Sequence, residues 1–183
     1  MENCLKKEYA WFPMRVTYQR EMMVKKALDE IGVENFLPMK SVLSELGGHR
    51  HYKIVPAVSN LIFIYDTYEN IADLKRSFTR LFPLRFIMTH PLDKTQSQTI
   101  TISDHKMANF IRIASHTDDS VMYLDISDVK GKEGRKVLVT AGEFAGVEGV
   151  VKRIQKNRRV VVQLDDLAAV AISFTPPIFL KYL

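Results

Sequence analysis

The sequence predicts an α+β protein of two domains: a ferredoxin-like domain with the element order β-α-β-β-α-β, then a small β-barrel. In residues 10–116, short runs of β-branched and aromatic residues alternate with segments of helical periodicity. Beyond these residues helical periodicity disappears, and short strands alternate with glycine and charge over about 50 residues, which favours a small barrel over a sandwich.

Residues 10–16 (AWFPMRV) predict the first strand, in which Pro13 favours an edge position or a bulge. Residues 19–32 (QREMMVKKALDEIG) predict a helix, because their apolar side chains recur on one face and Gly32 stands where a C-terminal cap belongs. Residues 33–43 (VENFLPMKSVL) predict a second strand that Pro38 interrupts.

A polar hairpin tip is expected at Gly47-Gly48, and the most apolar strand, residues 60–66 (NLIFIYD), should be central. Residues 68–82 predict the second helix and residues 84–88 the last strand of the first domain. A third helix is expected over residues 104–116, with Ser103 as its N-cap. The barrel strands are expected at residues 136–140, 149–154, 159–164 and 169–174.

Composition indicates a globular protein without a membrane span. The chain has 183 residues, 46% of them hydrophobic and 26% charged, and a net charge of +5. Its mean hydropathy is −0.08, and no apolar run approaches the ~20 residues of a membrane helix. The N-terminus lacks the apolar core of a signal peptide, and Cys4 is the only cysteine. We therefore expect a cytoplasmic protein without an internal disulfide.

No motif of catalysis or cofactor binding is evident. The sequence has no phosphate-binding loop, no GxGxxG or HExxH motif, no paired-cysteine zinc spacing and no GxSxG elbow. His49 and His51 could share a metal ion, but an exposed hairpin tip is the simpler interpretation. We expect neither an enzyme nor a cofactor.

Residues 142–164 (GEFAGVEGVVKRIQKNRRVVVQL) combine glycines with the densest positive charge of the chain. The glycines are expected to form the tight corners of the barrel, Phe144 to close one end of it, and Asn157 to turn the chain between two strands. The charged side chains belong to Lys152, Arg153, Lys156, Arg158 and Arg159. They form either a solvated hairpin tip or a contact with RNA or an acidic protein.

The same stretch resembles the KOW motif, which is shared by NusG-type transcription factors and some ribosomal proteins. Gly149 corresponds to the most characteristic glycine of that motif. Gly142-Glu143-Phe144 replaces the glycine-proline-phenylalanine turn of many members. The residues that carry this resemblance are Gly142, Phe144, Gly146, Gly149, Lys152, Arg153, Lys156, Arg158 and Arg159.

The N-terminal half resembles the NusG N-terminal (NGN) domain. The similar segments are residues 11–39 (WFPMRVTYQREMMVKKALDEIGVENFLPM) and residues 101–111 (TISDHKMANFI). The resemblance covers about residues 9–183 and is greatest with the specialised UpxY-like and RfaH-like antitermination members. It implies an NGN domain at residues 9–118, a linker at 119–134 and an SH3-like KOW domain at 135–183.

The resemblance implies an elongation or antitermination factor whose NGN domain binds RNA polymerase and suppresses pausing or termination. An apolar patch would contact the polymerase through Trp11, Phe12, Val58, Leu61, Phe86 and Ile87. Many relatives carry an aromatic-proline-glycine-tyrosine phrase where this chain has Val58–Leu61 (VSNL), so this surface loses aromatic bulk.

Specialised relatives also contact the displaced non-template DNA strand. Arg76 and Arg80 lie four residues apart and off the apolar stripe of the second predicted helix, and Lys75 and Arg15 are the next candidates. A ribosomal protein or termination factor is expected as the partner of the KOW domain, and the chain is expected to be a monomer. Two alternatives remain: a ribosome- or RNA-binding KOW protein, and a small-molecule enzyme on a ferredoxin-like scaffold.

Overall fold

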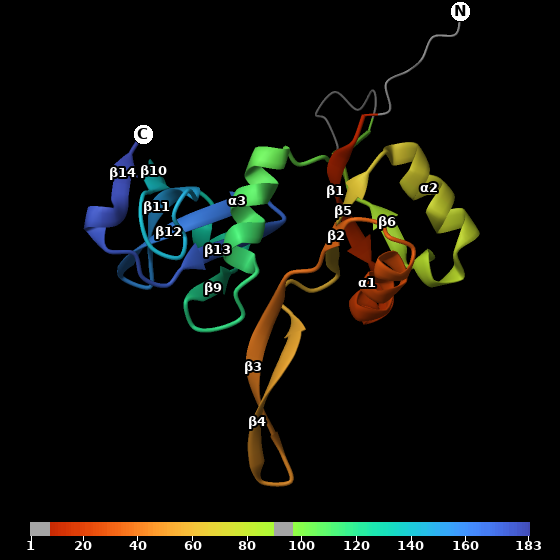
Figure 1. Cartoon of the computed structure of the whole chain (residues 1–183), viewed down its shortest axis with the longest axis horizontal. Helices are drawn as coiled ribbons and strands as arrows, with labels where there is room; N and C mark the ends of the chain where they lie inside the picture. Colours follow the sequence, from red (N-terminus) through yellow and green to blue (C-terminus); the bar gives the residue numbers. More distant parts are fainter. Residues whose placement is uncertain (1–7, 90–96) are drawn as a thin grey trace, which may run out of the picture. The chain divides into compact units, whose positions relative to one another are not determined.

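The computed structural model describes residues 8–89 and 97–183, which form two compact units (Figure 1). The first unit comprises the described residues up to Leu37 and Ser59–Asp104, and the second comprises Pro38–Val58 and His105–Leu183. Cys4 lies outside the described residues. Both units contain helices and strands, so the predicted α+β class is confirmed.

The first unit is built on an antiparallel four-stranded sheet with the order β2-β5-β1-β6. Its strands are β2 (Asn35–Phe36), β5 (Leu61–Asp66), β1 (Ala10–Val16) and β6 (Leu84–Phe86). The expectation that the most apolar strand is central is confirmed, because β5 pairs with both β1 and β2. Strand β6 stops at Phe86, two residues before the predicted end. A separate pair, β7 (Met88–Thr89) and β8 (Gln98–Thr99), follows.

The helices of this unit are shorter than predicted. A 3-10 turn η1 (Thr17–Gln19) precedes α1 (Glu21–Glu30). Gly32 follows the C-cap Ile31 with a φ of 70°, as expected for a C-terminal capping glycine. Helix α2 (Tyr68–Ser77) ends before the predicted residue 82, because Phe78 is extended and a 3-10 turn η2 (Thr79–Leu81) follows.

Pro38 divides the predicted second strand between the two units. Residues 35–36 form β2, whereas β3 (Met39–Leu46) pairs with β4 (His49–Pro56) in a long two-stranded ribbon (Figure 1). Gly47 and Gly48 form its tip at positive φ, as the sequence predicted. Proline lacks a backbone N–H, so Pro38 cannot donate a hydrogen bond to a neighbouring strand, and the pairing is interrupted there.

The second unit contains an antiparallel six-stranded sheet with the order β14-β10-β11-β12-β13-β9. Its strands are β14 (Leu180–Tyr182), β10 (Arg135–Val139), β11 (Glu148–Ile154), β12 (Asn157–Leu164), β13 (Ala168–Ile172) and β9 (Val121–Leu124). Helix α3 (Asp104–Ala114), apart from its first residue, belongs to this unit, as do the short helix α4 (Ile126–Val129) and the 3-10 turn η3 (Pro177–Phe179).

The core of the second unit lies around β12 and β13. All five residues of β13 are buried, on both faces of the sheet. On one face, Val129 of α4 packs against a cluster formed by Ile154, Val161, Ala169 and Ala171. The short apolar strands of the C-terminal region thus supply a core of their own.

Residues 119–134, which the resemblance implied to be a linker, include a strand and a short helix. Val121–Leu124 form the edge strand β9, which pairs with β13, and Val129 is fully buried. Its longest stretch that is exposed and outside a helix or strand is residues 130–134. Leu124 and Ile126 pack against the core cluster that contains Val129, so apolar contacts join this segment to the sheet.

The turn between β11 and β12 is also placed differently. Gln155 and Lys156 form it, with φ of 48° and 69°, whereas Asn157 already pairs with Ile154 in the ladder. Glycine and asparagine are the residues that usually occupy such a two-residue turn, so this position could not be predicted from propensity.

Candidate functional site

Two of the six predicted polymerase contacts meet beside α2. The Phe12 and Phe86 rings lie 6.0 Å apart, edge to face, and Tyr68 stacks on Phe86 at 4.6 Å. The Lys75 Nζ atom lies 4.7 Å from the centre of the Phe86 ring. Burial lowers the pKa of Lys75, with a smaller contribution from the Arg85 charge. This aromatic cluster joins α2 to the sheet.

Trp11 and Leu61 lie on the other face of the same sheet. Successive side chains of a strand alternate, so Trp11 cannot share a face with Phe12. Trp11 contacts the Tyr65 ring at 5.3 Å, and both Trp11 and Leu61 are buried. The predicted apolar patch is therefore divided between two faces.

The two remaining members of the predicted patch are half-buried. Ile87 directly follows β6, and its carbonyl accepts a hydrogen bond from the Ile100 N–H at 2.9 Å. Val58 belongs to the second unit. Phe86 is half-buried as well, so these three side chains are the accessible part of the predicted set.

Arg76 and Arg80 each have an acidic partner. Arg76 forms an ion pair with Asp73 one turn earlier on α2, and Arg80 forms one with Glu30 of α1. The Arg76 side chain is 76% exposed and the Arg80 side chain 53% exposed. Each guanidinium thus has its charge offset locally, which weakens a contact with phosphate.

Arg15 has a second arginine directly opposite it. The register of β1 and β6 places Arg15 against Arg85, and both are exposed. Arg85 also lies 5.0 Å over the exposed ring of Phe82. Sequence analysis missed Arg85 and Phe82; the signal that could have found them is the arginine within the short strand that ends at Phe86.

The Glu30–Arg80 pair predicts a pH dependence of stability. The hydrogen bond from Arg80, followed by its charge, holds the pKa of Glu30 below its ordinary value of 4.5. The folded state then binds a proton at Glu30 less readily than the unfolded chain. The stabilisation is present above about pH 4.5 and is lost as the pH falls through the lowered pKa of the folded state.

We therefore expect Glu30→Gln to lose less stability than the unsubstituted chain when the pH is lowered from about 7 to about 3.5. Urea midpoints at the two pH values measure this difference. Glu34→Gln is the matched control, because Glu34 is exposed and forms no ion pair among the described residues. Equal acid sensitivity of all three proteins would contradict the assignment.

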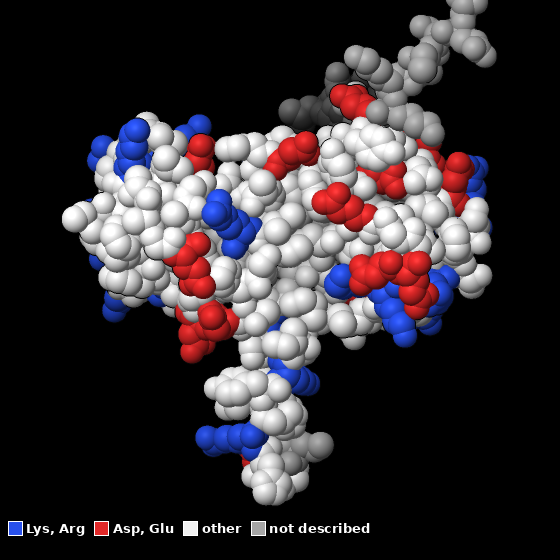
Figure 2. Space-filling view, in the orientation of Figure 1, with Lys and Arg blue, Asp and Glu red and all other residues white. Residues whose placement is uncertain are grey.

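The ribbon β3–β4 presents two different faces. Leu43 and Tyr52 are paired and Ile54 lies beside them, and all three are exposed. The opposite face carries Lys40, Lys53, His49 and His51. Lys and Arg side chains are visible along the ribbon in Figure 2. The alternation of the sequence predicts such a two-faced ribbon once the pairing is known.

The KOW-like glycines serve two different purposes. Gly142 and Gly146 have φ of 83° and 88°, as expected for corners of the chain. Gly149 lies inside β11, where an added Cβ would come within 2.8 Å of Val160 Cγ1 and 2.9 Å of the Val161 carbonyl oxygen. Phe144 is buried, and its ring meets His116 edge to face at 4.9 Å.

The basic cluster is not one surface. The Lys152 ammonium donates hydrogen bonds to the Val129 carbonyl at 3.0 Å and to Gln163 Oε1 at 3.3 Å. Arg159 is half-buried and donates to the Ser173 carbonyl. Arg153, Lys156 and Arg158 are exposed, and none of them forms an ion pair within residues 8–89 and 97–183. Two of the five cations therefore support the fold, and three remain available to a ligand.

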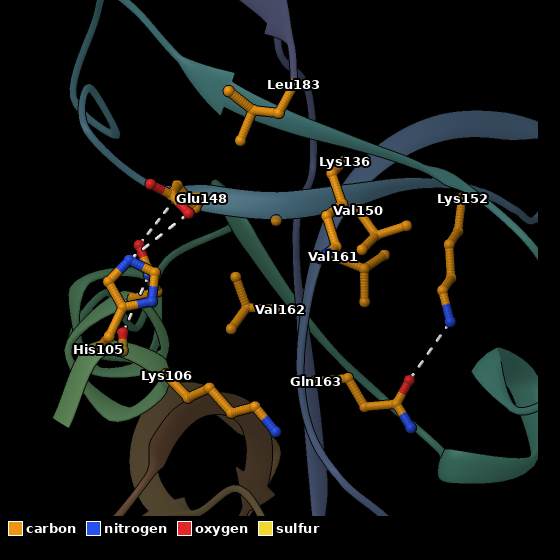
Figure 3. Close-up of a pocket in the computed structure, with 12 residues that line it drawn as sticks. His105, Lys106, Lys136, Glu148, Val150, Lys152, Val161, Val162, Gln163 and Leu183 are labelled. Carbon is orange, nitrogen blue, oxygen red and sulfur yellow. Dashed lines mark hydrogen bonds and ion pairs between the residues drawn. The ribbon is translucent and has the colours of Figure 1, made fainter. Parts of the chain in front are cut away.

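A cavity of about 280 Å³ lies between α3 and the six-stranded sheet (Figure 3). Val150, Val161 and Val162 line its apolar side. On its polar side, His105 Nε2 lies 3.5 Å from the Glu148 carboxylate, and Lys106 pairs with Asp165 at 3.2 Å. These groups satisfy one another, and the arrangement offers no nucleophile with a neighbouring base.

The described residues offer neither a metal site nor a membrane-spanning helix. His49 and His51 are exposed on β4, and no group of three metal-ligating side chains occurs within the part of the chain that the structure describes. Among the same residues, no helix has the length and apolar composition that crossing a bilayer requires.

Comparison with known proteins gives two matches to protein families. Residues 9–111 match the family described as "Transcription termination factor nusG", and residues 133–163 match the KOW motif. The two matches occur in the order that the sequence resemblance implied. A comparison with curated proteins finds none that matches the chain.

Proposed function

Because the chain belongs to the NusG family of transcription factors, we propose that it binds RNA polymerase through its NGN domain and suppresses pausing or termination. The NusG and KOW matches, in that order along the chain, carry this proposal. NusG-family domains imply a factor of transcription elongation or termination. Neither an enzymatic activity nor a cofactor is part of the proposal, and the proposed location is the cytoplasm.

The finer identity that we propose is a specialised UpxY-like or RfaH-like antitermination factor. The first unit would be ferredoxin-like, which its strand order β2-β5-β1-β6 supports, and the six-stranded sheet would be an SH3-like barrel. The factor would act as a monomer.

The accessible members of the apolar set are the best probes of polymerase binding. Trp11, Phe12 and Leu61 are buried, so their replacement would disturb the fold as well as an interface. Val58 and Ile87 are half-buried, and a carboxylate at either position would have to be desolvated on contact with the polymerase.

Arg15, together with Arg85, is the proposed contact with the non-template DNA strand. These two residues are directly opposite each other across β1 and β6, and Arg85 donates hydrogen bonds to the Phe82 and Leu84 carbonyls. Arg76 and Arg80 have acidic partners. Lys75 is held at the Phe86 ring. Two adjacent arginines match successive phosphates of a single strand.

The KOW domain would recruit a further protein, such as a ribosomal protein or a termination factor. An exposed apolar surface supports this role: Phe174 is 75% exposed and Ile178 is 86% exposed. Phe174 lines a cavity of about 360 Å³ together with Phe144 and Phe179. Large exposed apolar side chains of this kind are typical of protein contacts.

We expect the full chain to co-elute with core RNA polymerase and to shorten the lifetime of a transcriptional pause. Val58→Glu and Ile87→Glu should each weaken the complex roughly tenfold or more, because the carboxylate loses its hydration in the interface. Met22→Glu is the control, since Met22 is an exposed apolar residue of α1.

Binding by all three variants as tightly as by the unsubstituted chain would remove the apolar patch from the proposal. Co-purification with ribosomes in place of polymerase would favour a ribosome- or RNA-binding KOW protein.

A further inference from the structure

The six-stranded sheet carries a cationic groove that the proposed polymerase contact does not use. Arg135, Arg153, Lys156, Arg158 and Tyr182 line it together with Glu133, and its volume is about 540 Å³. We call these six residues the arginine–tyrosine groove. Its volume falls in the range of small-ligand sites, roughly 300–1,000 Å³. Lys and Arg side chains gather where β10 and β14 lie, as Figures 1 and 2 show together.

The strand register brings these cations together. Arg153 of β11 is directly opposite Arg158 of β12, and Lys156 occupies the turn that joins the two strands. Arg135, the first residue of β10, is opposite Val151, two residues before Arg153 on the same face. Side chains of directly opposite residues lie about 5 Å apart at Cβ, so the guanidinium groups can reach one ligand.

The like charges of the arginine–tyrosine groove destabilise the fold. Like charges directly across a ladder are destabilising. In the described part of the chain, Arg135, Arg153, Lys156 and Arg158 form no ion pair, and Glu133 is the single acidic residue lining the groove. A polyanionic ligand would turn this repulsion into attraction.

The backbone of the turn between β11 and β12 also supports a binding role. Gln155 and Lys156 both have positive φ, a conformation for which asparagine and glycine are far better suited. The chain thus keeps a long cationic side chain where Gly would be less strained. Such residues cluster at functional sites, where the strain is tolerated for the sake of the side chain.

Tyr182 adds an aromatic surface to the cations. It lies on β14 opposite Val137, and the Arg135 guanidinium is 4.3 Å from the centre of its ring. The residue is 45% exposed. An exposed ring among arginines binds unpaired bases by stacking, while the guanidinium groups bind the phosphates that join them.

We propose that the arginine–tyrosine groove binds a short stretch of single-stranded nucleic acid, with a base stacked at Tyr182 and phosphates held by Arg153 and Arg158. A duplex fits less well because its bases are stacked inside, and the carboxylate side chains of an acidic polypeptide have no ring to place on Tyr182. RNA and DNA share the chemistry that the groove recognises. The site belongs to the KOW half of the chain, and its occupancy does not depend on polymerase binding.

Fluorescence anisotropy with the full chain tests the proposal without polymerase. The probes are labelled oligouridylate and oligothymidylate of about 12 nucleotides and a duplex of the same length. Arg153→Ala with Arg158→Ala should lower the magnitude of the salt slope by about 1.4, or about 0.7 per phosphate, and weaken binding about 25-fold near 0.1 M salt. Tyr182→Ala should weaken binding roughly fivefold or more, and Tyr182→Phe should not.

The matched control removes two charges from the opposite face of β10 and β14. Lys136 and Lys181 are both exposed. Lys181 is opposite Leu138, and Lys136 lies two residues before Leu138, so both lysines are on the face that Arg135 and Tyr182 do not occupy. Lys136→Ala with Lys181→Ala should change the salt slope far less than the arginine pair. Thermal unfolding of the arginine double variant should show no loss of stability, because a like-charge contact is removed.

Binding of both single strands, or of RNA or DNA alone, supports the groove and identifies its ligand. Three results would overturn the proposal: an equal change of slope in the lysine control, tight duplex binding, or unchanged binding by Tyr182→Ala. Displacement of the oligonucleotide by polyglutamate at equal charge, without any effect of Tyr182→Ala, would assign the groove to an acidic protein.

Discussion

Gly149→Val is expected to lower the free energy of unfolding of the KOW half by about 1–3 kcal/mol or more, the usual cost of overpacking a core. Gly149 does not have positive φ, so the cause is space rather than backbone conformation. A Cβ at this position would meet Val160 Cγ1 at 2.8 Å and the Val161 carbonyl oxygen at 2.9 Å. The oxygen belongs to the backbone of β12 and cannot move without breaking the ladder.

Urea unfolding of Gly149→Ala, Val160→Ala and the double variant separates the two contacts. Val160→Ala removes the Cγ1 atom, so the double variant should lose less than the sum of the single losses. Gly131→Ala is the control for backbone strain alone, since Gly131 has a φ of 72° and no atom within 4 Å of the added Cβ. Strict additivity would mean that Val160 is not the obstacle.

The elements with strong periodicity could be predicted from the sequence, whereas contacts between distant residues could not. The apolar run at residues 60–66 correctly indicated the central strand β5, and Gly32 correctly marked the end of α1. The Glu30–Arg80 pair joins residues 50 positions apart, so no local pattern indicates it. The β9–β13 pairing likewise joins segments that are distant in the sequence, and hydrophobic periodicity carries no information about such a contact.

The faces of the candidate site could have been predicted and were not. Trp11 and Phe12 are neighbours in one strand, so alternation alone assigns them to opposite faces. The resemblance to a family supplied the identities of these residues but no assignment of faces. The pairing of Arg15 with Arg85 required the strand register, which the sequence does not contain.

Among the residues that the structure describes, two pairs of arginines lie directly opposite each other, one pair in each sheet. Arg15 faces Arg85 in the first sheet, and Arg153 faces Arg158 in the second. An arginine also lies over an aromatic ring near each pair. Arg85 itself lies over Phe82, and Arg135 lies over Tyr182. Two such sites on one chain would let a transcription factor hold nucleic acid at two points, with binding at the second favoured by its high effective concentration.

Asn109→Leu is expected to lower the stability of the second unit by about 1–3 kcal/mol, the usual cost of leaving a buried polar group unpaired. Asn109 is 8% exposed, and its Oδ1 atom accepts a hydrogen bond from the Glu148 N–H at 2.8 Å. Its Nδ2 atom donates to the His105 carbonyl at 3.0 Å. One side chain thereby joins α3 to the first residue of β11, although the NusG match includes Asn109 and ends before β11 begins.

Amide hydrogen exchange measures whether α3 and the sheet open together. In Asn109→Leu, protection should fall in α3 and in β11 alike, because the Glu148 N–H loses its acceptor at the point where they meet. Ser115→Ala is the control: its hydroxyl donates to the Ile111 carbonyl at 2.7 Å, within the same chain segment and without a contact to the sheet. Trp11 is the one tryptophan of the chain, so its fluorescence reports the unfolding of the first unit. The unfolding midpoint measured by this fluorescence should not change in Asn109→Leu. If Asn109→Leu exposes the amides of α3 while those of β11 stay protected, the helix is not part of the unit that contains the KOW sheet.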